Sequence, residues 1–280
     1  MTTALRPARL HRFAVIATLA AAPVVGLALS PMAQASTGAT PAFSPCGNPK
    51  DTTSHIWNGV KHATPMLKLG NRDVVFPNKD RSLGYAVHDG QAKPRSDVNL
   101  LVVPTVREHG IECDNLLDAA APHYFNDAYS EVSLMKGPDW ALGINSKDER
   151  DQDQLHIHLT RLYGPARADI DRAVKENKVP RNEHDWQKSV IEVTGHDQHG
   201  NDNKHAYRAW NTDSMDYNFF AKLNDDIVKP LKKSHSGAGM EHETMLITQN
   251  KQGTGFVVLE SDRNTGIHGV ANIEPLLNKG

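Results

Sequence analysis

The chain has 280 residues, of which 39% are hydrophobic and 23% charged, so it is long enough to bury a sizeable core. Its 31 Lys and Arg residues and 33 Asp and Glu residues give a formal net charge of −2 at pH 7. This balance argues against a nucleic-acid-binding protein, which carries a basic face. It does not exclude an anionic ligand, because a few local groups can bind one phosphate on an acidic protein.

Residues 1–35 have the pattern of a bacterial secretory signal peptide. Three arginines precede an apolar run over 13–29, and an Ala-Gln-Ala tripeptide ends at Ala35. The alternative is an uncleaved membrane anchor, which Pro23 and the modest length of the apolar run disfavour. We expect export to the periplasm or the exterior. The mature chain would begin at Ser36 with a net charge of −5, because the removed segment holds three arginines and no acidic residue.

The first half of the chain predicts helices and strands in mixed order. Small and polar residues over 36–50 indicate a mobile terminus. Next come, in chain order, a helix over 53–69, strands over 83–87 and 98–103, a helix over 114–135, and strands over 140–144 and 155–161. Pro65 weakens the second half of the first helix, and Pro122 can split the second helix in two.

The second half continues in the same style. Gly164-Pro165 opens a helix that runs to about Asn177, with proline at a favourable first position. The later elements are strands over 190–193 and 205–210, a helix over 214–231, and strands over 245–249 and 256–260 joined by a turn at 251–255. Strands and helices do not alternate strictly, which predicts an α+β fold with a mainly antiparallel sheet.

Two cysteines, Cys46 and Cys113, would lie in an oxidising compartment after export. A single disulfide is therefore expected, and it would tie the N-terminal arm to the residue before the second helix. The alternative is two unpaired thiols, because the sequence does not show whether their Cα atoms come close enough to bond.

Two of the fifteen histidines alternate with aliphatic residues, whereas most of the others lie among polar residues. From Gln154 to Thr160 the sequence is Gln-Leu-His-Ile-His-Leu-Thr, with a period of two. On a strand the three aliphatic side chains would point into the core, and Gln154, His156 and His158 would share the opposite face. A sheet gains no burial from such a polar face, so this segment is the main candidate for a functional site.

Three interpretations of this face are open. Histidine is tolerated on a solvent-exposed strand face. Two histidines at i and i+2 can also bind one Zn²⁺, although no third ligand stands at a recognisable spacing. In the third interpretation, the neutral imidazole of His156 attacks phosphorus to form a covalent intermediate. The imidazole of His158 would then stabilise charge or move a proton.

The segment from Gln154 resembles the His-x-His-x-His signature of the histidine triad superfamily. Its wider context resembles one branch, the CDP-diacylglycerol pyrophosphatases. The matching stretches are Leu83–Val87, Leu100–Thr105, Gly110–Glu112 with Leu116–Leu117, Tyr124–Phe125, Ile144–Ser146 with Gln152, and, more weakly, His205–Tyr207, Met245–Ile247 and Phe256–Leu259. The resemblance covers most of Arg81 to Glu260.

The resemblance implies a role for each residue of the segment. His156 takes the middle position of the triad, the nucleophile toward the α-phosphorus, and His158 takes the third, which binds the same phosphate. Gln154 stands where the first histidine usually stands; an amide can orient a neighbour but cannot titrate, which puts an acid-base role there in doubt. Three polar residues are expected to contact phosphate or ribose in the substrate, Asn145, Ser146 and Gln152, and Gln154 is expected to bind substrate as well.

The resemblance also implies a HIT-like fold and a reaction. The expected domains are residues 36–80 as a flexible terminus with the first helix and a catalytic domain over 81–280, with a core at about 81–165 and a C-terminal half over 166–280. The implied reaction cleaves CDP-diacylglycerol to CMP and phosphatidate without a metal or another cofactor. The partners would be this nucleotide lipid and, through it, a membrane surface, but not nucleic acid. Alternatives are a broader nucleotide pyrophosphatase, a zinc-dependent hydrolase and a nucleotide-binding module without turnover.

Overall fold

A computed structural model describes residues 43–78, 83–90 and 97–279. The predicted signal peptide lies outside these ranges. Within them, no helix combines the length and the apolar character that crossing a membrane requires.

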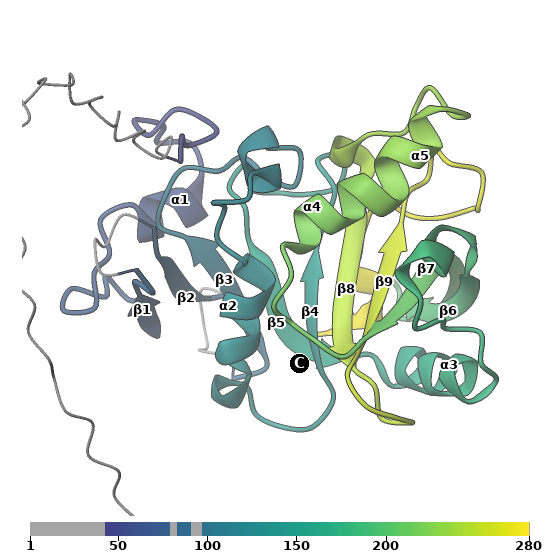
Figure 1. The fold of residues 1–280 in the computed structure, drawn as a ribbon. Coiled ribbons are helices and arrows are strands. Elements are labelled where there is room, and N and C mark those ends of the chain that lie inside the picture. Colours follow the sequence, from purple (N-terminus) through teal and green to yellow (C-terminus); the bar gives the residue numbers. More distant parts are fainter. Residues whose placement is uncertain (1–42, 79–82, 91–96, 280) are drawn as a thin grey trace, which may run out of the picture. The chain divides into compact units, whose positions relative to one another are not determined.

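An antiparallel sheet of ten strands organises the described residues (Figure 1), in the order β1-β2-β3-β5-β4-β8-β9-β7-β6, with β10 paired to the end of β5. This confirms the prediction of an α+β fold with a mainly antiparallel sheet. The strands are β1 (Asp73–Val75), β2 (Tyr85–Asp89), β3 (Asn99–Pro104), β4 (Trp140–Ile144), β5 (Ile157–Leu162), β6 (Val190–His196), β7 (Asp202–Thr212), β8 (Thr244–Gln249), β9 (Phe256–Ser261) and β10 (Leu277–Asn278). The sequence patterns did not indicate β1 and β10, which are too short to show a period.

The helices are shorter than their predicted ranges, except for α3. They are α1 (His55–Val60), α2 (Tyr124–Ser130), α3 (Gly164–Lys175), α4 (Phe219–Leu223) and α5 (Lys229–Lys232), with a π-helical turn over Asn224–Val228. The predicted helix over 114–135 is split around Pro122, whose missing N–H and ring do not fit a helix interior. The helix expected from residue 214 begins at Phe219, because the Asn218 side chain accepts hydrogen bonds from the first free N–H groups.

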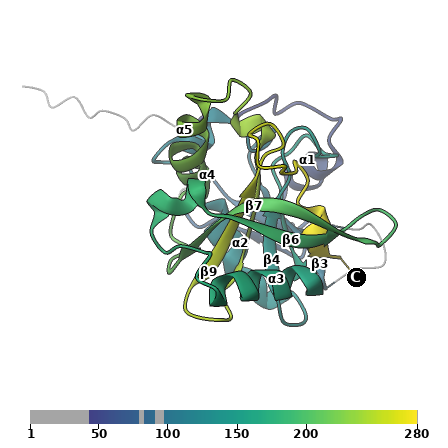
Figure 2. The ribbon, with the colours of Figure 1, turned by 90° about the vertical axis from the view of Figure 1, so that its right-hand side faces the viewer.

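The two faces of the sheet bury different apolar clusters. One face forms a single large core under α2 and α4, which includes Leu155, Ile157 and Leu159. The other face carries two separate clusters. One lies around α1 with Leu101, and the other lies around α3 and the C-terminal segment with Ile273 (Figure 2 shows α3 next to the hairpin of β6 and β7). On this face β5 presents His158, which belongs to neither cluster.

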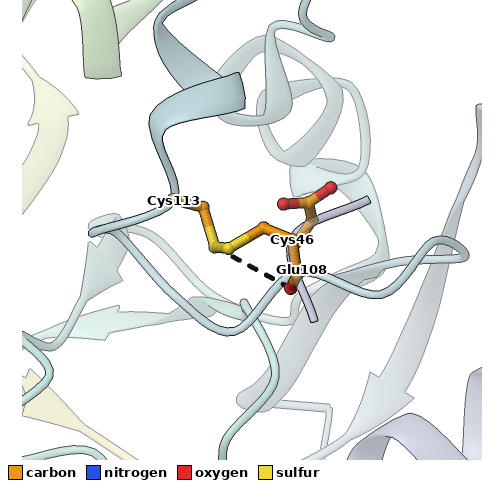
Figure 3. Close-up of side chains that lie close together, drawn as sticks. All are labelled: Cys46, Glu108 and Cys113. Carbon is orange, nitrogen blue, oxygen red and sulfur yellow. Dashed lines mark hydrogen bonds between the residues drawn. A yellow bond between two sulfur atoms is a disulfide. The ribbon is translucent and has the colours of Figure 1, made fainter. Parts of the chain in front are cut away.

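A disulfide joins Cys46 to Cys113, with their Cα atoms 5.8 Å apart (Figure 3). The backbone of Cys46 bridges that of Glu108, and the next residue, His109, donates its N–H to the Cys46 carbonyl oxygen at 3.0 Å. Glu108 in turn accepts from the N–H of Leu155 at 2.7 Å. Part of the terminus predicted to be mobile thus contacts the segment that leads into β5. The composition of that part could not show a covalent partner 67 residues away.

The predicted domain boundary near residue 81 does not divide the sheet. β1 lies before that position and pairs antiparallel with β2, with Val74 opposite Ala86. The described residues before and after it therefore share one sheet.

Removing the disulfide should lower the free energy of unfolding. Closing a loop of 67 residues is worth about 4 kcal/mol in the chain-entropy account. We expect the double variant Cys46→Ala/Cys113→Ala to unfold at a lower urea concentration than the oxidised wild type, and thiol titration of unfolded, unreduced wild type to find no free cysteine. Two free thiols, or equal unfolding midpoints, would contradict the bridge.

Candidate active site

A pocket of about 450 Å³ lies over β5, between the two apolar clusters of that face. This volume is in the range of about 300–1,000 Å³ that small-molecule sites occupy. Most of its described lining residues are polar or charged. They are His55, His88, Asp89, Asn99, Asn145, Asp151, Gln152, His156, His158, Glu274 and Lys279. The pocket is therefore suited to a polar ligand.

Strand register explains why histidines gather here. His158 lies opposite Leu101 of β3 and Gly143 of β4, and Leu101 lies opposite His88 of β2. Residues opposite each other point to the same face, so His88 and His158 flank Leu101 in one row. The ring centroids of His156 and His158 are 5.1 Å apart. The prediction that these two histidines share a face opposite the aliphatic residues is confirmed.

The His156 ring has a defined proton position. Its Nδ1 lies 2.7 Å from the backbone carbonyl oxygen of Gln154. A carbonyl oxygen can only accept a hydrogen bond, so Nδ1 donates and Nε2 carries the lone pair. Burial lowers the pKa of His156, which keeps the ring neutral near pH 7. A buried neutral imidazole with its lone pair on Nε2 is chemically a nucleophile or a base.

His158 is buried without a hydrogen-bond partner for either ring nitrogen among the described residues. Its Nε2 lies 3.5 Å from a carboxylate oxygen of Glu274. Burial, with the neighbouring His156, lowers the pKa of His158 well below its ordinary value. A buried polar group usually has a partner, because leaving it unpaired costs about 1–3 kcal/mol. Neither nitrogen of His158 is therefore committed to a hydrogen bond among the described residues, and Nε2 faces the Glu274 carboxylate.

Gln154 does not line the pocket, contrary to its expected role in substrate binding. Its side chain is fully buried against residues 104–108 instead. Its side-chain oxygen accepts from Arg107 Nη1 at 3.0 Å and from Glu108 N at 3.3 Å. Its side-chain nitrogen donates to the carbonyl oxygens of Val106 at 3.0 Å and Pro104 at 3.3 Å. The amide is fully used in holding the segment whose carbonyl orients His156.

The loop between β4 and β5 holds the three other polar residues that were expected to bind substrate, and two of them line the pocket. Asn145 and Gln152 line the pocket. Asn145 accepts from the Ile273 N–H at 2.8 Å, and Gln152 accepts from the His55 N–H at 3.1 Å, so both side chains are held in place. Ser146 is fully buried and does not line the pocket, although its hydroxyl has no partner among the described residues.

The C-terminal segment supplies two pocket residues that the sequence patterns missed. β10 pairs with the end of β5, and the Thr160 hydroxyl donates to the Asn278 carbonyl oxygen at 2.9 Å. This pairing brings Glu274 and Lys279 to the pocket, where their charged groups lie 2.6 Å apart. The tail shows no periodicity, so no local signal could have found them. His88 lies in β2, one residue beyond the strand predicted over 83–87, so the prediction did not include it.

Two of the three carboxylates that line the pocket are in ion pairs, and the third is that of Asp151. Asp89 binds Arg72 at 2.7 Å, and Glu274 binds Lys279. The pairing of these two carboxylates weakens their repulsion of an anion, and the neutral imidazoles and amides remain as hydrogen-bonding groups for a ligand.

A family model of the CDP-diacylglycerol pyrophosphatases matches residues 52–280, a range that includes every lining residue named above. The chain belongs to the CDP-diacylglycerol pyrophosphatase family. A Yersinia pestis protein named CDP-diacylglycerol pyrophosphatase is 39% identical over 87 residues, which are 28% of this chain and 33% of that protein. A Mycobacterium leprae (strain TN) protein named probable CDP-diacylglycerol pyrophosphatase is 32% identical over 136 residues, 45% and 49% of the two chains. The chain thus spans about a third and about half of these relatives' lengths.

Burial of the two histidines predicts a pH dependence of stability. Their pKa values are lowered in the folded chain, so the unfolded chain binds protons at higher pH than the folded one. The free energy of unfolding should therefore fall as the pH drops through about 6.5, the ordinary value for histidine. NMR of ring-labelled protein should show both rings titrating below that value. Between pH 7 and pH 5, the free energy of unfolding measured with urea should fall less in His158→Gln than in wild type. A ring that titrates at or above the ordinary value would contradict this account.

Proposed function

We propose that this chain is an exported enzyme of the histidine triad type that hydrolyses CDP-diacylglycerol to CMP and phosphatidate through a covalent cytidylyl-His156 intermediate. The observation that carries this proposal is the orientation of His156, whose Nδ1 is held by the Gln154 carbonyl oxygen while Nε2 keeps its lone pair. Family membership and the names of the two relatives support the choice of substrate.

The first step transfers the cytidylyl group to the enzyme. Nε2 of His156 attacks the phosphorus bonded to cytidine, an N–P bond forms, and the bond from that phosphorus to the bridging oxygen breaks. Phosphatidate leaves with that oxygen and its electron pair. The substituted ring of His156 becomes cationic, and the Gln154 carbonyl oxygen stabilises its Nδ1–H. Hydrogen bonds from His158 and Asn145 would stabilise the charge on the phosphoryl oxygens.

The second step restores the enzyme. Water attacks the same phosphorus, the N–P bond breaks, and CMP leaves as the electron pair returns to Nε2 of His156. His158 is close enough to take part in moving the proton of this water, with its ring centroid 5.1 Å from that of His156. Splitting the hydrolysis into two displacements makes each of them easier than direct attack by water.

The zinc-dependent alternative has less support from the geometry. Zinc sites use three or four protein ligands. Within the ranges that the structure describes, two groups of three potential ligands lie with their atoms within 4.8 Å of one another: Cys46, Glu108 and Cys113, and His109, Glu112 and Asp153. Neither group includes His156 or His158, and the cysteines of the first are already bonded to each other.

Chelation separates these two mechanisms. If His156 is the nucleophile and His158 binds the phosphate, then EDTA should leave the rate of CMP release from CDP-diacylglycerol nearly unchanged. A loss of most of the activity that added Zn²⁺ restores would instead favour the metal site. Protein dialysed against buffer without EDTA controls for activity that is lost during handling.

Substitution of each histidine tests the assigned roles. His156→Ala removes the covalent route and should reduce kcat by several orders of magnitude. His158→Ala should lower kcat about 10²- to 10³-fold, which is the effect of losing one group that stabilises the oxyanion. CMP release from CDP-diacylglycerol in detergent micelles measures both, and Gln198→Ala, in an exposed turn, serves as the matched control.

Trapping the intermediate gives a second readout. Alkaline quenching of a reaction with cytidine-labelled substrate should yield an acid-labile protein adduct in wild type and in His158→Ala, but none in His156→Ala. An adduct in His156→Ala would place the nucleophile elsewhere. Activity without any adduct, under rapid quenching, would indicate direct attack by water.

A further inference from the structure

The loop over residues 64–70, between α1 and β1, carries the three most exposed large apolar side chains among the described residues. Met66 is 97% exposed, Leu67 57% and Leu69 46%. Single exposed apolar residues are common on proteins, but three within four positions form a local apolar patch. We call residues 64–70 the apolar loop.

The apolar loop has a defined shape. The Thr64 N–H donates to the Leu67 carbonyl oxygen, and the Leu67 N–H donates to the Thr64 hydroxyl oxygen, both at 2.9 Å. Leu69 has a φ of 50°, a left-handed conformation that leucine rarely adopts. The backbone thus holds apolar side chains in water at some conformational cost, which points to a partner that buries them.

The apolar loop is attached to the wall of the pocket. Its last residue, Gly70, lines the pocket. The next residue, Asn71, is buried, donates to the Gly59 carbonyl oxygen at 2.9 Å and is hydrogen-bonded through Oδ1 to His88 Nδ1 at 2.9 Å. His88 lies in the same cross-strand row as His158. A surface that contacts the loop therefore lies next to the pocket.

The lining of the pocket shows what that surface must supply. Among the described lining residues, Ile56 and Leu101 alone have large apolar side chains, and both are largely buried. The pocket can bind the polar headgroup of the proposed substrate, but it offers little apolar surface for two acyl chains. The acyl chains then stay in the bilayer, and the pocket has to come to the level of the headgroups.

We propose that the apolar loop inserts into the interfacial region of a phospholipid bilayer and so places the pocket over headgroups in the membrane; this inference rests on the proposed function. Met66 and Leu67 enter the boundary between headgroups and acyl chains. Lys68, which lies in the apolar loop itself, faces the lipid phosphates. The ion pair of Lys68 with Asp73 is exposed and can exchange for a phosphate, because such pairs contribute little stability.

Vesicle binding without substrate tests the loop directly. The double variant Met66→Ser/Leu67→Ser should bind vesicles of phosphatidylcholine and phosphatidylglycerol at least about tenfold more weakly than wild type in co-sedimentation. The matched control, Leu134→Ser/Val190→Ser, removes exposed apolar side chains elsewhere and should bind as wild type does. All variants are made in the same full-length chain, so any contribution of residues 13–29 is common to them.

Hydrogen–deuterium exchange locates the contact. In wild type, vesicles should slow exchange in peptides that cover the apolar loop, and this protection should be lost in Met66→Ser/Leu67→Ser. Unchanged exchange of those peptides, or equal binding by the double variant and the control, would overturn the proposal.

Activity measurements distinguish a role of the loop in membrane contact from a role in the chemical reaction. For Met66→Ser/Leu67→Ser, kcat/KM on CDP-diacylglycerol in vesicles should fall about tenfold relative to the control pair, and kcat/KM on a short-chain, water-soluble CDP-diacylglycerol should not change. If vesicles slow hydrogen exchange in the loop but neither substrate is hydrolysed, the proposed function is contradicted and the membrane-docking role of the loop is supported. An equal loss on both substrates would overturn the membrane role.

Discussion

The pocket depends on a single constraint, which is that β5 lies inside the sheet and must be apolar on one face only. Leu155, Ile157 and Leu159 fill the large core on that face. The opposite face lies between two apolar clusters that do not merge, and it holds His156 and His158. If the second face were also aliphatic, the two clusters would join and close the site. The two candidate histidines therefore lie where the fold gives up apolar packing, although both rings are buried.

Gln154, in the segment before β5, has a structural role at the position where the triad signature has its first histidine. An amide at Gln154 cannot titrate, but its four hydrogen bonds fix the backbone whose carbonyl oxygen sets the His156 tautomer. Arg107, which holds that amide, is itself buried and paired with Asp51 at 2.9 Å. The disulfide fixes the neighbouring chain through Glu108. Orientation of the proposed nucleophile thus depends on contacts well outside the pocket.

Neutral imidazoles suit the chemistry that this arrangement supports. Burial lowers the pKa of both histidines, and a protonated ring could not attack phosphorus. The same burial leaves the ring nitrogens of His158 without a hydrogen-bond partner among the described residues, and in the proposed function they bind the phosphate. A polar pocket lies next to an exposed apolar loop, and in the two proposals the pocket binds the headgroup while the loop contacts the membrane.

The sequence by itself determined the class of fold, most strands and the face that His156 and His158 share, because alternation along a strand is set by neighbouring residues. It also determined the family resemblance, which the match over residues 52–280 confirms. Tertiary structure alone decided that Gln154 and Ser146 leave the pocket and that Glu274 and Lys279 enter it. These positions follow from strand pairing and loop contacts between residues far apart in the chain, and such contacts leave no period or spacing for a local pattern to reveal.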